Sequence, residues 1–302
     1  MIPILYLVLP TLGIYVMLSI LFLRRPHLLH TTWAPTFPVR LAAHRGGSGE
    51  RLENTMEAIK NSMAQRADIL ELDCQLTRDG VVVVSHDKNL SRQSGLNKDV
   101  DSLDFKELPL YKTELEIYFS PGQFAHGSDR HMIRLEDVFQ EFPRLPAIVE
   151  IKEKNEELIH KVVANLARSF DRSEITIWAS EKNSIMKMCK AANPEMPMAF
   201  TILRSIWILL LYYLGLLPFV SIPEKFFLCF LPTIINRVIM RKSLIQHLQD
   251  RGVQVLFWCL NEESDFEVAF NLGASGVMTD FPTALRRYLD KKEEPRAPAS
   301  SI

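Results

Sequence analysis

The chain has 302 residues, and its 35 lysines and arginines nearly equal its 36 aspartates and glutamates. This balance gives no bulk positive field for nucleic acid and no acidic excess typical of disordered chains. The length fits one large domain, for which barrel folds commonly use about 250 residues. The four cysteines lack the spacing of a zinc site or a disulfide framework, so we expect free, buried thiols. Nothing in the composition implies a protein partner.

Residues 2–23 form an uncharged, almost wholly apolar stretch. As a helix it reaches about 33 Å, which is enough to cross a bilayer. A cleavable signal peptide is the alternative, but the stretch lacks a basic leader and a small-residue cleavage site, and Arg24 and Arg25 follow it. We therefore predict a retained membrane anchor over residues 1–25, followed by a linker over 26–39.

Beyond the linker, apolar runs alternate with helical patterns, which is typical of parallel strands joined by crossover helices. This alternation predicts an α/β fold, a TIM (β/α)₈ barrel over 40–290, with a flexible tail over 291–302. Segment 76–80 is too short for a crossover helix, so the second and third strands form either a hairpin or an irregular part of the barrel. Residues 88–145 are expected to form an inserted lid. The expected strands are 40–43, 69–74, 81–85, 147–151, 175–179, 198–202, 253–258 and 276–278.

Polar residues interrupt or follow these strands at their C-terminal ends. His44 follows the first strand, Glu71 and Asp73 end the second, His86 follows the third, and Glu150 ends the fourth. In a barrel this is the face where reacting groups gather. The sequence therefore predicts that these five side chains meet at one mouth.

The three carboxylates are candidate metal ligands. Glu71 and Asp73 are two residues apart on a strand, so their side chains point to the same face. Glu150 lies in an apolar run, where an unpaired carboxylate is costly to bury. Oxygen ligands without sulfur favour Mg²⁺ or Ca²⁺ over zinc. Taken singly, each acid is equally well explained as a structural partner in an ion pair.

The histidines are candidate acid/base groups. His44 and His86 each follow an apolar strand, and imidazole transfers protons near neutral pH. A lone histidine is more often a structural hydrogen bonder, but two beside a carboxylate cluster favour catalysis. Arg45 is suited to clamp a phosphate.

These motifs together resemble the glycerophosphodiester phosphodiesterase family, and in particular its mammalian membrane-anchored members that act as lysophospholipase D. The resemblance covers residues 40–290 and includes the anchor exit. The matching motifs are His44-Arg45-Gly46, Glu53-Asn54-Thr55, Glu71-Leu72-Asp73, Thr77-Arg78-Asp79-Gly80, His86-Asp87, Glu150-Ile151-Lys152, Trp258 and Thr279-Asp280.

The resemblance implies hydrolysis of lysophosphatidylcholine and related lysophospholipids, N-acyl lysophosphatidylethanolamine among them, to lysophosphatidic acid and the head-group alcohol through a cyclic phosphate. Arg45 and Lys152 would add positive charge around the phosphate, and Glu53 would orient a metal ligand or approach the metal itself. Asp87 is either exposed or a partner of His86. Trp258 is expected to be a wall of the mouth.

The resemblance also implies residence in the endoplasmic reticulum or perinuclear membranes. Arg24 and Arg25 favour a cytosolic catalytic domain, whereas a Ca²⁺ requirement favours a lumenal one.

A second apolar segment over 205–223 is long enough to span a membrane. One crossing there would place strands of the barrel on opposite sides of the bilayer, so the barrel could not close. We therefore predict a membrane-associated insertion over 205–236, after the sixth strand, with a buried core helix as the alternative. An acyl chain is expected to slide from the bilayer along Trp207, Tyr212, Tyr213 and Phe219.

Two rival functions share part of this pattern. A phospholipase C or a sphingomyelinase D type barrel uses the same metal and histidines, and the released head group distinguishes them. A non-catalytic phospholipid-binding scaffold is disfavoured because every expected catalytic position is filled.

Overall fold

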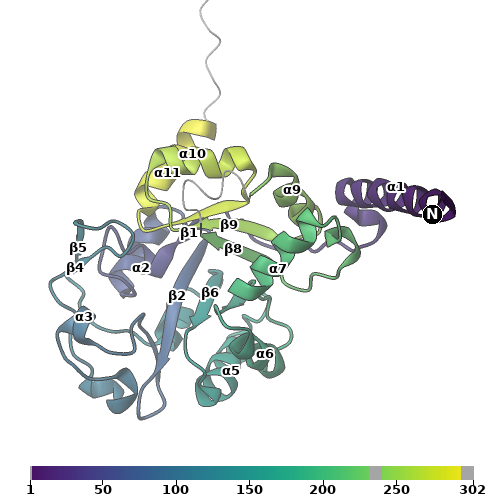
Figure 1. Ribbon diagram of the computed structural model, residues 1–302. Helices are drawn as coiled ribbons and strands as arrows, with labels where there is room; N and C mark the ends of the chain where they lie inside the picture. Colours follow the sequence, from purple (N-terminus) through teal and green to yellow (C-terminus); the bar gives the residue numbers. More distant parts are fainter. Residues whose placement is uncertain (1, 231–239, 294–302) are drawn as a thin grey trace, which may run out of the picture.

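The computed structural model describes residues 2–230 and 240–293, and its centre is a parallel sheet (Figure 1). Seven strands pair in the order β7-β6-β2-β1-β10-β9-β8. The strands are β1 (Leu41–Ala43), β2 (Ile69–Leu76), β3 (Val82–Val84), β4 (Glu114–Glu116), β5 (Phe124–His126), β6 (Ala147–Ile151), β7 (Thr176–Ala179), β8 (Phe226–Phe230), β9 (Gln254–Trp258) and β10 (Gly276–Thr279).

Two residues close this sheet into a ring. Met198 bridges Trp178 of β7, and Ala199 bridges Phe226 of β8, both in parallel. The Ala199 N–H donates to the Trp178 carbonyl at 2.8 Å, and the Phe200 N–H donates to the Phe226 carbonyl at 2.9 Å. The seven strands and the short segment at Met198 and Ala199 together make the eight staves of a closed barrel. The predicted (β/α)₈ barrel is therefore confirmed.

The order of strands differs from the prediction in one place. The predicted strand 81–85 is β3, which pairs antiparallel with β2 outside the ring, because the turn at Thr77–Gly80 leaves no room for a crossover. The hairpin alternative is therefore the correct one. The remaining barrel strand is β8, which lies inside the predicted insertion 205–236. The insertion is therefore the segment before β8. It follows the fifth strand position of the ring, not the sixth.

Side chains alternate between the inside and the outside of the barrel, as the two-residue period of a strand requires. The lower interior is filled by a compact apolar cluster that includes Ala42, Ile69, Ile148, Leu256 and Met278. The next inward position above Ile69 is Glu71, and the one above Ile148 is Glu150. The apolar packing therefore ends where the carboxylates begin.

Helices surround the barrel and bury the outward strand residues in the main hydrophobic cluster. Helix α2 begins after Thr55, whose hydroxyl accepts from the Ala58 N–H. The helices are α1 (Ile2–Arg24), η1 (Pro26–Leu28), η2 (His44–Gly46), α2 (Met56–Ala64), α3 (Ser91–Ser94), η3 (Val100–Ser102), η4 (Phe105–Glu107), α4 (Leu135–Glu141), η5 (Glu157–Val163), α5 (Ala164–Ser169), α6 (Asn183–Ala192), α7 (Ile202–Tyr213), η6 (Leu217–Phe219), α9 (Lys242–Asp250), α10 (Glu263–Leu272) and α11 (Pro282–Glu293).

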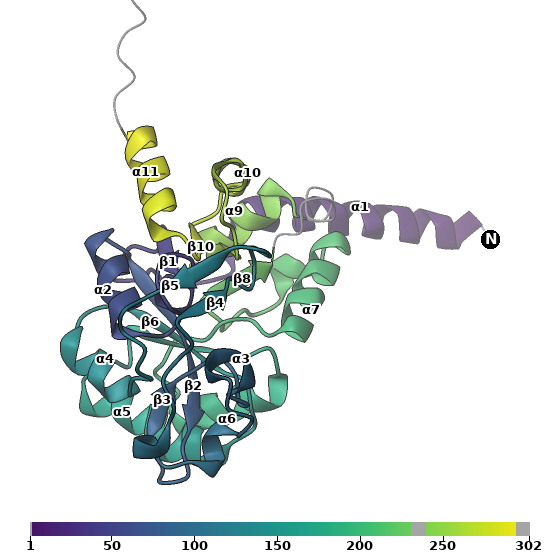
Figure 2. The same cartoon turned by 90° about the vertical axis from the view of Figure 1, so that its left-hand side faces the viewer.

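The segment between β3 and β6 carries its own small core, which includes Leu90, Val100, Tyr111 and Leu115. Its β4–β5 hairpin lies across the barrel in Figure 2. At the tip, the Asn261 side-chain amide donates to the Ser120 hydroxyl at 3.0 Å. The hairpin is therefore attached to the loop that follows β9.

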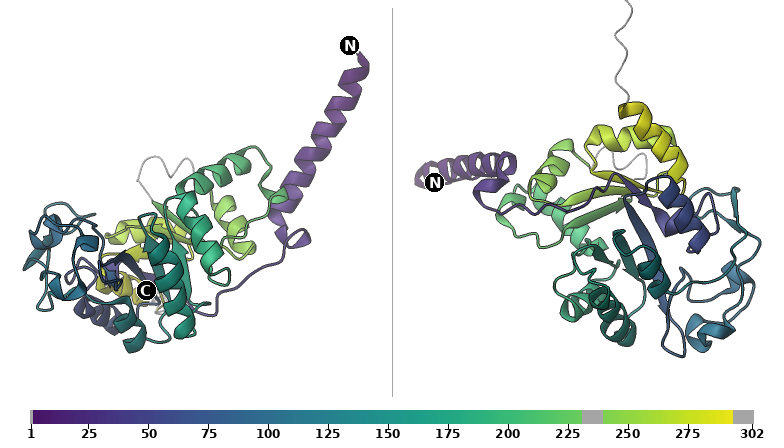
Figure 3. Two further views of the ribbon diagram at one scale, coloured as in Figure 1. Left: turned by 90° about the horizontal axis from the view of Figure 1, so that it is seen from below. Right: turned by 180° about the vertical axis from the view of Figure 1, so that it is seen from behind.

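Helix α1 extends away from the rest of the molecule (Figure 3). Residues 6–24 are apolar and long enough to cross a membrane, and 6% of that span is buried. Near its C-terminal end, the Ser19 hydroxyl donates to the Gly215 carbonyl at 2.7 Å, and Phe22 packs edge-on against Phe219. His247 hydrogen-bonds the Leu23 carbonyl at 2.9 Å. The anchor candidate is therefore attached to the segment after α7.

The predicted tail and the predicted insertion both extend beyond the described residues. The flexible tail was expected from residue 291, but α11 continues to Glu293, and residues 294–302 lie outside the described part of the chain. Residues 231–236 of the predicted insertion also lie outside it.

Candidate active site

Three carboxylates meet where β2 and β6 run side by side. Asp73 and Glu150 are register partners in this pair, and Glu71 lies one inward position below Asp73. One oxygen from each of Glu71, Asp73 and Glu150 lies within 4.8 Å of the other two. The Lys152 ammonium is 3.0 Å from Asp73 Oδ1 and 3.1 Å from Glu150 Oε2. The strand register therefore brings together the three predicted ligands.

The neighbours of these carboxylates move their pKa values in opposite directions. Burial and the charges of Asp73 and Glu150 raise the pKa of Glu71 well above its usual range. Burial alone would also raise the pKa of Asp73, but Lys152 and Arg45 outweigh it and lower that pKa. Burial and Asp73 raise the pKa of Glu150. The cluster holds more negative charge than its protein partners neutralise, which favours a bound cation.

The donor set fits a hard divalent cation. Glu71 Oε1 is buried and has no hydrogen-bond partner among the described residues, and such an orphaned acceptor is costly without a ligand. All three groups offer carboxylate oxygens, which Mg²⁺ and Ca²⁺ prefer. These residues could therefore hold one such ion.

A second cluster, His44, Cys259 and Asp280, also brings three ligand atoms together. Burial and Asp280 raise the pKa of the Cys259 thiol well above its usual range, so the thiol keeps its proton. His44 Nδ1 already lies 2.6 Å from Asp280 Oδ1. This cluster is better explained as a hydrogen-bond network than as a metal site.

His44 is held by the loop after β10. Its Nδ1 bonds Asp280, which also accepts from the Ser48 hydroxyl and from the Asn261 amide at 2.8 Å. Burial alone would raise the pKa of Asp280, but His44 and these donors lower it. An ionised Asp280 places the ring hydrogen on Nδ1, which leaves Nε2 to face Glu71 Oε2 at 3.9 Å. His44 therefore presents a free nitrogen to the carboxylate cluster.

His86 is held in a matching way. Its Nδ1 lies 2.6 Å from Asp87 Oδ1, and the Arg92 guanidinium donates to Asp87 Oδ2 at 2.6 Å. Burial opposes ionisation of Asp87, but His86 and Arg92 outweigh it and lower its pKa to about 2. Of the two alternatives for Asp87, an exposed residue or a partner of His86, the structure shows the partner of His86.

Arg45 and Glu53 form a buried pair behind the carboxylates. Arg45 has a positive φ of 48°, an uncommon conformation, and its N–H donates to Glu71 Oε2 at 2.8 Å. The Arg45 Nη1 donates to Glu53 Oε2 at 3.1 Å, and Arg92 and Gln93 also donate to Glu53. Glu53 thus pairs with Arg45 and Arg92 and is not one of the three carboxylates that could hold a metal ion.

One cavity of about 540 Å³ joins these groups, lined by His44, Arg45, Glu71, His86 and both Glu150 and Lys152. Aromatic rings form part of its wall. Phe119 at the tip of the β4–β5 hairpin has its ring centroid 5.6 Å from His44 and 5.8 Å from Trp258. Trp258 therefore lies in the wall of this cavity.

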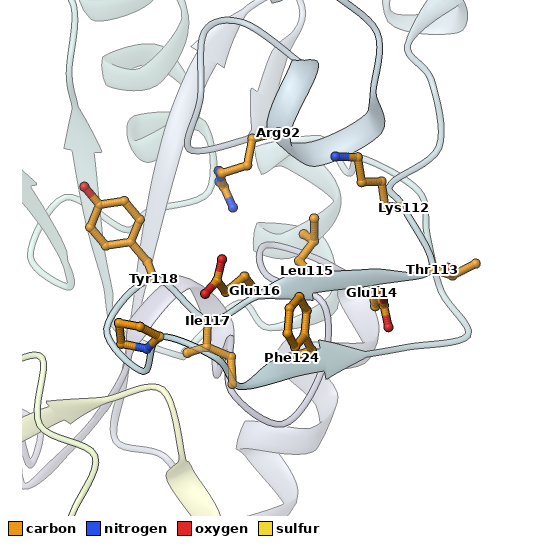
Figure 4. A pocket seen from close by; sticks show the side chains of 10 residues that line it. Arg92, Lys112, Thr113, Glu114, Leu115, Glu116, Ile117, Tyr118 and Phe124 are labelled. Atoms are coloured by element: carbon orange, nitrogen blue, oxygen red, sulfur yellow. The ribbon is translucent and has the colours of Figure 1, made fainter.

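A second cavity of about 650 Å³ lies on the hairpin side, and Tyr118 lines both (Figure 4). Arg92 and Lys112 point into it from one side, and Glu116 and Phe124 from the hairpin. The 540 Å³ cavity also has charged groups at the carboxylate cluster, but beyond them it continues along apolar side chains such as Ile206 and Leu209.

The sequence assigned Asp280 no role beyond its place in the Thr279-Asp280 motif, and it did not single out Phe119 as a site residue. Asp280 directly follows β10, so the strand-end rule applied to the other acids points to it as well. Phe119 comes from a long connection, and no periodic signal places it over the barrel.

The comparisons with known proteins agree with this geometry. The model of the Glycerophosphoryl diester phosphodiesterase family matches residues 44–284. The chain is 79% identical to Lysophospholipase D GDPD3 of Mus musculus, with 99% of this chain and 96% of the relative covered, and 71% identical to Lysophospholipase D GDPD3 of Homo sapiens, with 95% and 96% covered.

Among solved structures, the glycerophosphodiester phosphodiesterase of Agrobacterium tumefaciens has the same fold, with a TM-score of 0.63 at 18% identity over 82% of this chain and 99% of that one. The family match spans the barrel together with all five residues at its mouth. The chain belongs to the glycerophosphoryl diester phosphodiesterase family.

Proposed function

We propose that this protein is a lysophospholipase D that hydrolyses lysophosphatidylcholine and related lysoglycerophospholipids to lysophosphatidic acid and the head-group alcohol. The observation that carries the proposal is the convergence of three carboxylates and two histidines on one cavity. The names of the mouse and human relatives support the substrate class.

Glu71, Asp73 and Glu150 would hold one divalent cation, Mg²⁺ or Ca²⁺. When bound, such an ion polarises a phosphoryl oxygen and lowers the pKa of a coordinated hydroxyl. The unpartnered Glu71 Oε1 supports this assignment.

His44 and His86 move the protons. Each imidazole is fixed through Nδ1 by a carboxylate, so each presents Nε2 to the cavity. One of these nitrogens takes the proton of the glycerol 2-hydroxyl as that oxygen attacks phosphorus and forms a cyclic phosphate. The other protonates the departing choline or ethanolamine oxygen, and water then opens the ring.

Arg45 and Lys152 supply positive charge beside the phosphate. Both line the cavity, and nearby carboxylates outweigh burial and raise the pKa of each above its usual range. They therefore remain cations during the reaction.

Helix α1 would keep the enzyme in a membrane of the endoplasmic reticulum or the perinuclear region. The apolar span over residues 6–24 supports a membrane anchor. The membrane is then also the source of the lysolipid.

The proposal is tested with the full-length protein in detergent after chelation by EDTA. Adding Mg²⁺ or Ca²⁺ should restore release of choline from lysophosphatidylcholine, because the carboxylates need the ion to bind the phosphate. Full hydrolysis by the chelated protein would contradict the metal-dependent reaction.

A second prediction concerns Asp280. Asp280→Asn should lower kcat about 10- to 100-fold with a smaller change in KM, because the imidazole of His44 loses the acceptor that fixes its tautomer. Asp290→Asn, a change at a half-exposed aspartate of α11, is the control. Asp280 is a positioning residue, so Asp280→Glu should recover part of the rate, and an unchanged kcat in Asp280→Asn would remove Asp280 from this role.

A further inference from the structure

The catalytic cavity has an apolar arm that the reaction at phosphorus does not use. Beyond the carboxylates, it is lined by Ile202, Ser205, Ile206 and Leu209 of α7 and by Phe230 of β8. The α7 residues are spaced i, i+3, i+4 and i+7, so they share one face of the helix. Over this face the arm follows α7 for about 10 Å.

The neighbouring face of α7, about a third of a turn around the helix, is also apolar and exposed. Leu203, Trp207 and Leu210 are 64%, 48% and 46% exposed. The side of α7 that packs on the protein is a third one, marked by the fully buried Ile208, and Ile206 at the arm is itself 57% exposed. Exposed apolar surface of this kind marks an interaction site.

The segment after α7 is fastened to the anchor helix. Tyr15 and Ser19 of α1 donate to the carbonyls of Leu214 and Gly215, and Tyr15 and Phe22 pack on Phe219. These residues of α1 belong to the span that can cross a membrane. The exposed face of α7 is therefore held at the level of the lipid.

We infer that the arm between the cavity-lining face of α7 and β8 is an acyl-chain channel. Ile206 and Leu209 determine the preference of the enzyme for long-chain substrates. This inference rests on the proposed function. It goes further by assigning each part of the substrate to one region of the cavity. The phosphate lies at the carboxylates, and the chain runs along α7 toward the bilayer.

The other cavity is a poorer acyl site. Arg92, Lys112, Glu114 and Glu116 line it, and an alkyl chain placed there would desolvate charged groups without pairing them. Along α7, the lining of the arm consists of the Ser205 hydroxyl and three aliphatic side chains.

The channel also changes the predicted path of the chain. The sequence suggested Trp207, Tyr212, Tyr213 and Phe219, but none of them lines the cavity. Tyr212 hydrogen-bonds the Ser243 hydroxyl at 2.7 Å, and Phe219 packs on α1. The chain-binding face of α7 is therefore the one that turns toward β8.

The test compares Ile206→Trp and Leu209→Trp with Leu210→Trp, which adds the same indole on a face of the helix that does not line the cavity. Substrates are oleoyl and hexanoyl lysophosphatidylcholine at a fixed mole fraction in one detergent micelle. Each methylene buried in the channel is worth about fourfold in kcat/KM. The wild type should therefore prefer the oleoyl substrate.

Filling the channel should lower the oleoyl-to-hexanoyl ratio of kcat/KM at least about tenfold, while Leu210→Trp keeps the wild-type ratio. Ile206→Ser, which adds no volume, should also lower the ratio and guards against misfolding of the tryptophan variants. An unchanged ratio in all channel variants of an active enzyme would overturn the channel alone. A wild type that hydrolyses neither lysolipid would overturn the proposed function and the channel with it.

Discussion

Glu71→Gln and Asp73→Asn are each expected to lower hydrolysis of lysophosphatidylcholine at least about a thousandfold. Each change removes one negative ligand from the three-carboxylate cluster, and a catalytic cation is worth several kcal/mol in such a reaction. Binding of Mg²⁺ or Ca²⁺, measured by titration calorimetry, should weaken in parallel.

Glu107→Gln is the matched control for these two variants. Glu107 is an exposed carboxylate on the inserted segment, and it pairs with Arg78 at 2.8 Å. Its loss should leave both ion binding and turnover unchanged. Near-normal ion affinity and turnover in Glu71→Gln would remove Glu71 from the metal site.

His44→Ala and His86→Ala should each lower kcat about 10²- to 10⁴-fold, the usual contribution of one acid/base group. Calorimetric ion binding should stay close to normal, because neither imidazole belongs to the three-carboxylate cluster. Each variant removes one of the two Nε2 atoms that Asp280 and Asp87 hold in place.

His131→Ala is the control, since His131 is an exposed residue paired only with Asp129 in the described contacts. It should retain full turnover. If either active-site variant turned over substrate at the rate of His131→Ala, that histidine would have no role in proton transfer.

The sequence predicted the barrel because its strands alternate with helices. It predicted the place of four polar residues, His44, Glu71, Asp73 and Glu150, because parallel strands end on one face. His86 reaches the same mouth for another reason, because β3 returns antiparallel beside β2. The strand-end rule holds for Glu150 and His44, which lie beside Asp73 and Glu71 through the register of β6 and β1 with β2. Strand geometry alone was therefore enough to place these side chains at the mouth of the barrel.

The sequence assigned the wrong strand to the ring. The Val82–Val84 run has the composition of a barrel strand, yet its short connection pairs it antiparallel with β2. The apolar pattern places the Phe226–Phe230 run in the insertion, because hydropathy alone does not separate a buried strand from a membrane-facing segment. Its pairing with β9 is a long-range contact that composition does not reveal.

The fine structure of the site also depends on long-range contacts. Asp280 orients His44 from a position 236 residues away, and Phe119 reaches the mouth from the β4–β5 hairpin. The inner and outer faces of α7 are both apolar, so only the barrel shows which face lines the cavity.

The proposed reaction is tested by the products that the wild-type protein forms from lysophosphatidylcholine and divalent cation in water enriched in oxygen-18. A cyclic phosphate opened by water predicts free choline and lysophosphatidic acid, with the heavy oxygen on the phosphate of the lipid. Release of phosphocholine and monoacylglycerol, or of lipid phosphate without the heavy oxygen, would contradict it.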